Sequence, residues 1–142
     1  LIRYEMNDMV VLDSKCSCGS NFRRIKKVLG RHDDLLYFLD TEQQQKYIFP
    51  DLFVRWIIVC SENIREFQVV QHKVNEVMIY LDLISDDSEQ IIQTVQNKII
   101  TELAAFNINQ PIVHIEFKEI TLPQDKNKYK RFISTILKQD EI

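Results

Sequence analysis

An arginine and an acidic pair stand between two apolar runs in the stretch KVLGRHDDLLYF, which covers residues 27–38. Arg31 offers a planar fork of N–H donors that suits a hydroxyl or a phosphate. Asp33 lies at the junction of two expected strands, where a carboxylate can change partners when the backbone rotates. The same charges would also be satisfied as a solvated ion cluster in a turn, so the residues alone leave both interpretations open.

Asp8 and Lys128 carry the same kind of ambiguity near the two ends of the chain. Asp8, in RYEMND, suits either a turn or the acceptor for a vicinal diol such as a ribose. Lys128 lies in QDKNKYKR, a basic loop that is solvated in most proteins. A lysine delivered on a loop is also a suitable point charge for a developing phosphoryl negative charge.

The cysteines allow half of a zinc site. Cys16 and Cys18 form a Cys-x-Cys-Gly sequence, whereas a structural zinc ion takes four ligands, usually as two pairs. The alternative is two reduced thiols in a turn. Cys60 falls on an apolar helical stripe and is expected in the core. Three cysteines and no secretory signal favour reduced thiols and a cytoplasmic location.

Composition excludes several classes of partner. The 142 residues contain 18 basic and 21 acidic side chains, a net charge of −3, so we expect no broad attraction to nucleic acid. No apolar run approaches the roughly 20 residues of a membrane span, so no membrane partner is expected either. The chain starts at Leu1 directly in a strand-like pattern, which suggests a piece of a longer protein.

Periodicity predicts a mixed chain of short strands and two helices. Strands are expected at 2–6, 9–12, 23–30, 35–39, 46–49, 65–73, 75–83 and 112–117, with a turn at Asn7-Asp8. One helix is expected to start at Pro50 and another after an N-cap at Ser85, its apolar stripe running from Ile91 to Phe106. Residues 131–137 form a closing element of either type.

The order of these elements favours an α+β fold. From Lys46 onward it reads strand, helix, strand, strand, helix, strand, which is the β-α-β-β-α-β order of a ferredoxin-like domain. A short β-hairpin region precedes that unit, and a boundary is expected around Asp33. The fold is a common one and by itself names no function.

Four segments in order resemble the C-terminal part of adenylate-forming enzymes, in the phenylacetate–CoA ligase-like branch that includes capsule-associated members. RYEMND resembles that family's RYRTGD, and CSCGSNFRRIKKVLGRHDDLL resembles its CPCGR…I…I.GR.DD.L segment. YIFPDLFVRWI…REFQVVQ is similar to V.P…I…….QYQVVQ, and LPQDKNKYKR to IPRTEGKAKR. The resemblance covers residues 3–133, nearly the whole chain.

The resemblance implies a role for four residues. Asp8 would hold the ATP ribose, Arg31 would contact the nucleotide, Asp33 would be the hinge, and Lys128 would be the catalytic lysine of adenylation. Residues 1–32 would be the hairpin and the end of the large-domain and hinge segment, and residues 33–142 the mobile C-terminal lid domain.

The resemblance also implies a reaction and its participants. The parent ligase would convert a small carboxylic acid and Mg-ATP into acyl-AMP, then pass the acyl group to a thiol such as coenzyme A. The partner would be the N-terminal adenylation domain of the same chain, without which this fragment would be inactive. Met6-Asn7 replaces the family's Thr-Gly and Asn127 its Gly, and asparagine tolerates the left-handed backbone that glycine supplies.

A second hypothesis is a stand-alone ferredoxin-like module that binds a metabolite and has no catalytic activity. The element order supports it equally. Several hundred coding residues before Leu1 would favour the ligase, and a start codon near Leu1 would favour the module.

Overall fold

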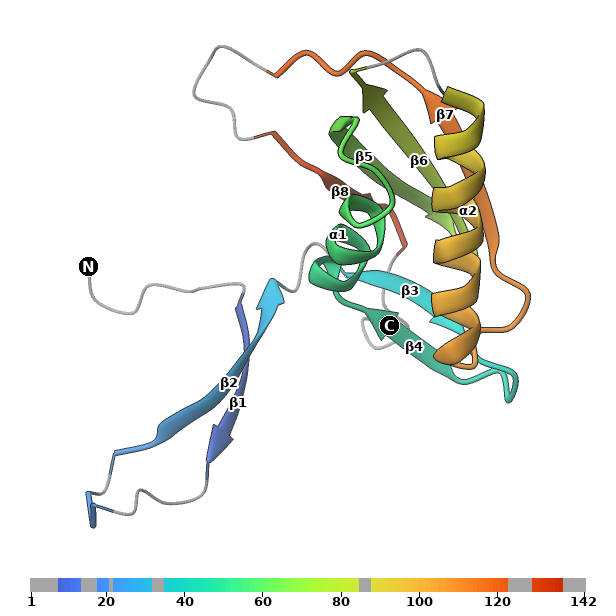
Figure 1. Ribbon diagram of the computed structural model, residues 1–142. Coiled ribbons are helices and arrows are strands. Elements are labelled where there is room, and N and C mark those ends of the chain that lie inside the picture. The colour runs from blue at the N-terminus through green and yellow to red at the C-terminus, as the bar shows by residue number, and fades with distance from the viewer. Residues whose placement is uncertain are drawn as a thin grey trace.

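The computed structural model of the chain describes residues 8–13, 18–20, 22–31, 35–84, 88–122 and 129–136 (Figure 1). The elements in these ranges are β1 (Asp8–Asp13), β2 (Arg24–Arg31), β3 (Leu36–Leu39), β4 (Gln45–Ile48), α1 (Pro50–Ile58), β5 (Ile64–Lys73), β6 (Glu76–Leu83), α2 (Ser88–Ala105), β7 (Ile112–Phe117) and β8 (Phe132–Ser134).

The predicted strands and helices are confirmed wherever the structure describes them. The closing element, left open by the sequence, is the short strand β8. The turn predicted at Asn7-Asp8 is wrong at Asp8, which is the first residue of β1. The partner of β1 in the described structure is β2, and the predicted strand at 2–6 lies outside the described residues. The Ser85 N-cap also lies outside them.

A four-stranded mixed sheet forms the centre of the molecule and confirms the α+β class. Its strand order is β7-β6-β5-β8. β5 and β6 are antiparallel, and α2 carries the chain from β6 across to β7, which is parallel to β6. β8 returns to the opposite edge and lies parallel to β5. Figure 1 shows α1 and α2 on the same side of this sheet.

The strand at 45–48 is placed differently from the ferredoxin-like expectation. The expected order of elements is present, but β4 pairs with β3 in a separate two-stranded sheet rather than joining the four-stranded one. β6 pairs directly with β7, with no strand between them, and β8 adds an edge strand beside β5. Side chains connect β3 to β5 across 34 sequence positions, and local sequence patterns carry no signal for a contact of this range.

The core lies between the sheet and the two helices. Pro50 occupies the first turn of α1, where its missing N–H is tolerated, and Phe53, Trp56 and Ile57 are buried. The buried residues of α2 are Ile91, Val95, Ile99 and Leu103, as its stripe predicts. Phe106, expected to end that stripe, is 43% exposed and packs against the Trp56 ring at 5.9 Å. Neither helix in the described ranges is long and apolar enough to cross a membrane.

The turn between β3 and β4 depends on one buried carboxylate. Asp40 Oδ1 accepts hydrogen bonds from the backbone N–H groups of Glu42 and Gln44, each at 2.9 Å. These bonds, the one from Gln44 foremost, lower the pKa of Asp40, and Lys46 Nζ lies 3.4 Å from its other oxygen. Gln43 adopts a φ of 60°, a conformation that glycine usually supplies in such loops.

The β1–β2 hairpin is separate from this core, as Figure 1 shows. No described residue before Leu35 is buried. Cross-strand pairing places four apolar side chains on one face of the hairpin, namely Val10, Val28, Leu12 and Ile25. They remain between 39% and 61% exposed. A two-stranded hairpin with an uncovered apolar face is marginally stable by itself.

The left-handed Gln43 gives a direct test of the turn. Replacing Gln43 with glycine should raise the free energy of unfolding by about 0.5–1 kcal/mol, because a non-glycine residue at this φ carries strain. Urea denaturation measures the change. The matched variant Gln44→Gly, where φ is not positive, should lower the free energy of unfolding instead. Equal effects of the two substitutions would contradict the assigned turn.

Candidate functional site

Asp8 and Arg31 come together in the structure. They are Cα partners in the antiparallel β1–β2 ladder, Asp8 as the first residue of β1 and Arg31 as the last residue of β2. Residues directly opposite each other on paired strands are close neighbours. Twenty-three positions apart in sequence, the two expected ribose contacts therefore lie side by side, at the end of the hairpin that leads to Asp33.

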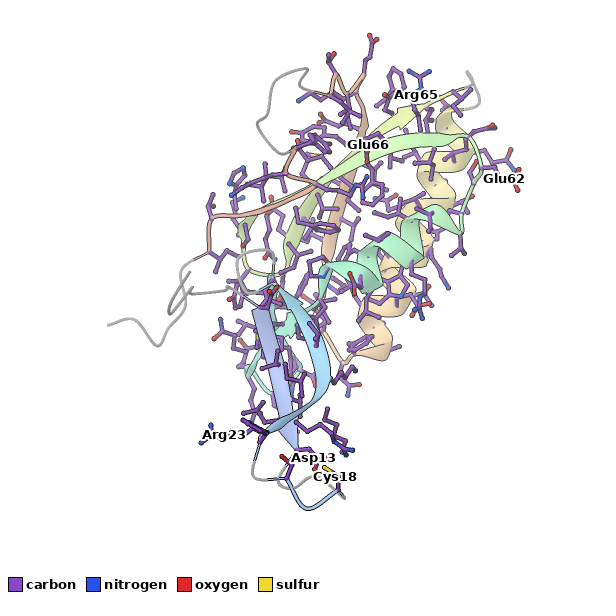
Figure 2. The ribbon with its side chains drawn as sticks, turned by 90° about the vertical axis from the view of Figure 1, so that its left-hand side faces the viewer. Asp13, Cys18, Arg23, Glu62, Arg65 and Glu66 are labelled. Atoms are coloured by element: carbon purple, nitrogen blue, oxygen red, sulfur yellow. The ribbon has the colours of Figure 1, made fainter. Side chains whose placement is uncertain are left out.

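Of the other predicted site residues, Cys18 alone falls in the described part of the chain. Cys16, Asp33 and Lys128 lie outside the described residues. Cys18 is exposed and lies in the turn region at the tip of the hairpin, where Figure 2 labels it. In the described part of the chain, no three histidine, cysteine or acidic side chains gather as metal ligands would. The half zinc site therefore stays a prediction.

The chain on both sides of residues 123–128 is attached to the same end of the four-stranded sheet. On one side, the Ile120 N–H donates to Asp82 Oδ2 at 3.3 Å. On the other side, Arg131 pairs with Glu66. Glu66 on β5 and Asp82 on β6 are cross-strand partners. The Tyr129 hydroxyl, next to Lys128 in sequence, donates to the Phe67 carbonyl oxygen at 3.2 Å.

The Arg131–Glu66 pair is the strongest charged contact in this region. Arg131 Nε and Nη2 donate to the two carboxylate oxygens of Glu66, both at 2.8 Å, a two-pronged geometry that favours Arg over Lys. The guanidinium also lies over the Phe67 ring, 5.0 Å from its centre. Glu66 lies at the start of β5, where Figure 2 labels it beside Arg65.

Two opposing effects act on the pKa of Glu66. Partial burial raises it, while the hydrogen bonds from Arg131 and from the Phe67 N–H lower it, and the net pKa is lowered. The pKa of Arg131 is raised, chiefly by its hydrogen bond to Glu66. Both groups are therefore charged near neutral pH, and the pair fixes the start of β8.

A second polar contact joins β3 to the sheet, and the sequence analysis did not identify it. Gln71 on β5 is fully buried, and its amide bonds both the N–H and the carbonyl oxygen of Tyr37, each at 2.7 Å. Asn75, just after β5, does the same for Leu39. The sequence did contain a signal for this contact. Gln71 alternates with Phe67 and Val69, so it falls on the buried face of the strand, where a polar side chain needs a partner.

Comparison with known proteins gives a likeness of fold. The sequence matches no protein-family model and no curated protein. The structure is similar to the crystal structure of 2-hydroxyisobutyryl-CoA ligase, solved in the postadenylation state in complex with 2-HIB-AMP, with a TM-score of 0.56 and 15% sequence identity. The similarity covers 90% of this chain and 27% of that ligase. The chain therefore shares the fold of about a quarter of an acyl-CoA ligase.

The lowered pKa of Glu66 predicts a pH-dependent contribution to stability. A depressed carboxyl pKa stabilises the folded state above the ordinary value of 4.5, and this contribution is lost as pH falls through the lowered pKa. At pH 7, Glu66→Gln should reduce the free energy of unfolding by about 1–2 kcal/mol, a moderate value because Arg131 is partly exposed. The deficit relative to the unmodified chain should shrink towards pH 3. Denaturant titrations across this range measure it.

The half-buried pair Lys98–Glu102, one helical turn apart on α2, is the matched control. Glu102→Gln should change the free energy of unfolding by about 0.5 kcal/mol or less. A deficit for Glu66→Gln that is as small, or that does not vary with pH, would mean that the Arg131 pair does not fix the start of β8.

Proposed function

We propose that this chain is the C-terminal part of an ATP-dependent acyl-adenylating ligase, of the phenylacetate–CoA ligase-like branch. The observation that carries the proposal is the cross-strand pairing of Asp8 with Arg31, the two residues that the family resemblance assigns to the nucleotide. The likeness to 2-hydroxyisobutyryl-CoA ligase supports it at the level of fold. In this proposal the parent converts a small carboxylic acid and Mg-ATP into acyl-AMP and pyrophosphate, and then forms a thioester, with coenzyme A as acceptor.

Asp8 and Arg31 offer an acceptor and a set of donors to a nucleotide. A carboxylate such as that of Asp8 accepts hydrogen bonds from both hydroxyls of a ribose, and the Arg31 guanidinium can only donate. Ladder pairing sets the two backbones at a fixed spacing, so one ribose can lie against both residues. Mg²⁺ would neutralise phosphate charge on ATP, and Lys128 would stabilise the charge that develops when the carboxylate attacks the α-phosphate.

Asp33 would be the pivot between two bodies. The β1–β2 hairpin precedes Asp33 in the chain and supplies no described core residue. The packed α+β unit follows Asp33 and begins with the buried Leu35. Rotation about this point would bring Lys128 to the nucleotide for adenylation and remove it for thioester formation. The domain division at residues 32 and 33 is part of this proposal.

The exposed apolar face of the hairpin fits the same scheme. Val10, Leu12, Ile25 and Val28 lie on one side of a two-stranded sheet with no described cover. The preceding N-terminal adenylation domain of the parent would bury them and would also hold the acyl pocket. Apolar side chains gathered on one exposed face mark an interaction surface, and the ligase hypothesis supplies a partner for it.

The coding sequence before Leu1 tests the proposal most simply. Several hundred codons that encode an adenylation domain are expected there. A start codon at or near Leu1 would overturn the proposal and favour the metabolite-binding module.

The catalytic role of Lys128 gives the kinetic test. In the full-length parent, Lys128→Ala should slow adenylate formation by about two or more orders of magnitude, because the lysine acts on charge present only in the transition state. Transfer of the acyl group from a preformed adenylate to coenzyme A should change far less. Pyrophosphate release and thioester formation, measured separately, distinguish the two steps.

Lys126 and Lys130 are the controls for charge. The Lys130 carbonyl oxygen accepts a hydrogen bond from Gln68 at 2.9 Å, a contact that replacing its side chain with alanine leaves in place. Lys126→Ala or Lys130→Ala should keep adenylate formation within a few-fold of the unmodified enzyme. The 142-residue chain alone should release no pyrophosphate, and activity of the isolated chain would contradict the fragment assignment.

A further inference from the structure

On the side that faces β5, β3 is attached by amide side chains in place of a backbone ladder. Gln71 Oε1 accepts from the Tyr37 N–H and Gln71 Nε2 donates to the Tyr37 carbonyl oxygen, both at 2.7 Å. A primary amide offers the same donor and acceptor as a peptide group, so Gln71 substitutes for a neighbouring strand. Gln71 is fully buried, which leaves its amide no solvent partner.

Asn75 repeats this contact two residues further along β3. Its Oδ1 accepts from the Leu39 N–H at 2.6 Å, and its Nδ2 donates to the Leu39 carbonyl oxygen at 3.2 Å. The same Nδ2 reaches the Asn109 carbonyl oxygen at 2.7 Å. Asn75 has a φ of 63°, in the left-handed region that asparagine tolerates better than most residues. Together Gln71 and Asn75 form what we call the amide clamp.

The amide clamp also contacts β8. Ser134 Oγ donates to Gln71 Oε1 at 3.4 Å, and the backbone of β8 runs parallel to β5 with Gln71 opposite Ser134. β8 begins one residue after Arg131, so the Arg131–Glu66 ion pair lies at the start of the strand and Ser134 at its end. One buried side chain thus touches both β3, which starts at Leu36, and the strand that follows residues 129–131.

We infer that Gln71 and Asn75 are positioning residues that make the hinge-side strand β3 and the lysine-side strand β8 move as one rigid body. The inference rests on the proposed function, in which Asp33 precedes β3 and Lys128 precedes β8. Rotation at the hinge displaces the lysine by a defined amount only if no joint yields between the two strands. The clamp closes that joint, because the other backbone contacts of β3 in the described structure are its ladder with β4 and the hydrogen bond from the Asn109 N–H to the Leu39 carbonyl oxygen at 2.9 Å, and neither of them reaches β5 or β8.

Amide exchange in the 142-residue chain tests the clamp without any assumption about catalysis. Gln71→Met keeps a similar length and removes both bonds to Tyr37. The protection factors of the Tyr37 and Leu39 amides should fall at least ten-fold, while those of β6 stay within two-fold of the unmodified chain. Gln93→Met, on the exposed face of α2, is the matched control and should leave β3 unchanged.

Asn75→Gly provides a second variant, in case Gln71→Met does not fold. Glycine keeps the positive φ and removes only the amide. Protection at Leu39 should then fall more than protection at Tyr37. If β3 stays as protected as in the unmodified chain in the variants that fold, the clamp does not hold β3 and the inference is overturned.

Half-reactions of the full-length parent test the positioning role. Gln71→Met should slow adenylate formation five- to ten-fold and leave transfer from a preformed adenylate within two-fold, since only the first step needs the lysine in place. Combined with Lys128→Ala, it should add no further loss, because both changes remove the same interaction. Val95→Ala, a core change on α2, is the control for lost stability and should not separate the two steps.

The outcomes separate the inference from the proposed function. Faster exchange of β3 with no separation of the half-reactions, although Lys128→Ala does separate them, would overturn the positioning role and leave the ligase assignment intact. If Lys128→Ala has no effect on adenylate formation, the proposed function fails, and with it the positioning role, while the exchange data still decide whether the clamp exists.

Discussion

The buried amide of Gln71 is the constraint on which the arrangement of this chain depends. An amide with no access to water must find both a donor and an acceptor, or the folded state loses much of its stability. Tyr37 supplies both from its backbone, which fixes β3 beside β5 at one register. β4 follows β3 through the Asp40 turn and delivers the chain to Pro50, so the start of α1 is set by the same contact.

β4 lies outside the four-stranded sheet, in a two-stranded sheet with β3. β4 pairs with β3, which the clamp attaches to β5 by side chains, and the free edge of β5 is occupied by β8. The short β8 has only three residues, yet side chains reinforce it at both ends. Arg131 binds Glu66 before the strand begins, and Ser134 reaches Gln71 at its end.

Sequence patterns predicted the elements better than their assembly. The alternation in β5 and β6, the proline-started helix α1 and the stripe of α2 are local signals, and each element is where the pattern indicates. Strand pairing depends on contacts such as the one between Gln71 and Tyr37, which are 34 positions apart. No periodic pattern in a single sequence marks a contact of that range. The pairing of Asp8 with Arg31 is of the same kind, and only the family resemblance related the two residues.

The two parts of the chain differ in what stabilises them, and this difference favours a joint between them. The unit from Leu35 onward encloses its own core, with aromatic and aliphatic side chains from both helices packed on the sheet. The hairpin has a ladder and an apolar face but, in its described residues, no core. A segment of this kind is stabilised by whatever covers it. In the proposed ligase, the packed unit would therefore turn relative to the hairpin without breaking the described core contacts, and the cost of rotation would fall on the few backbone angles at the proposed hinge.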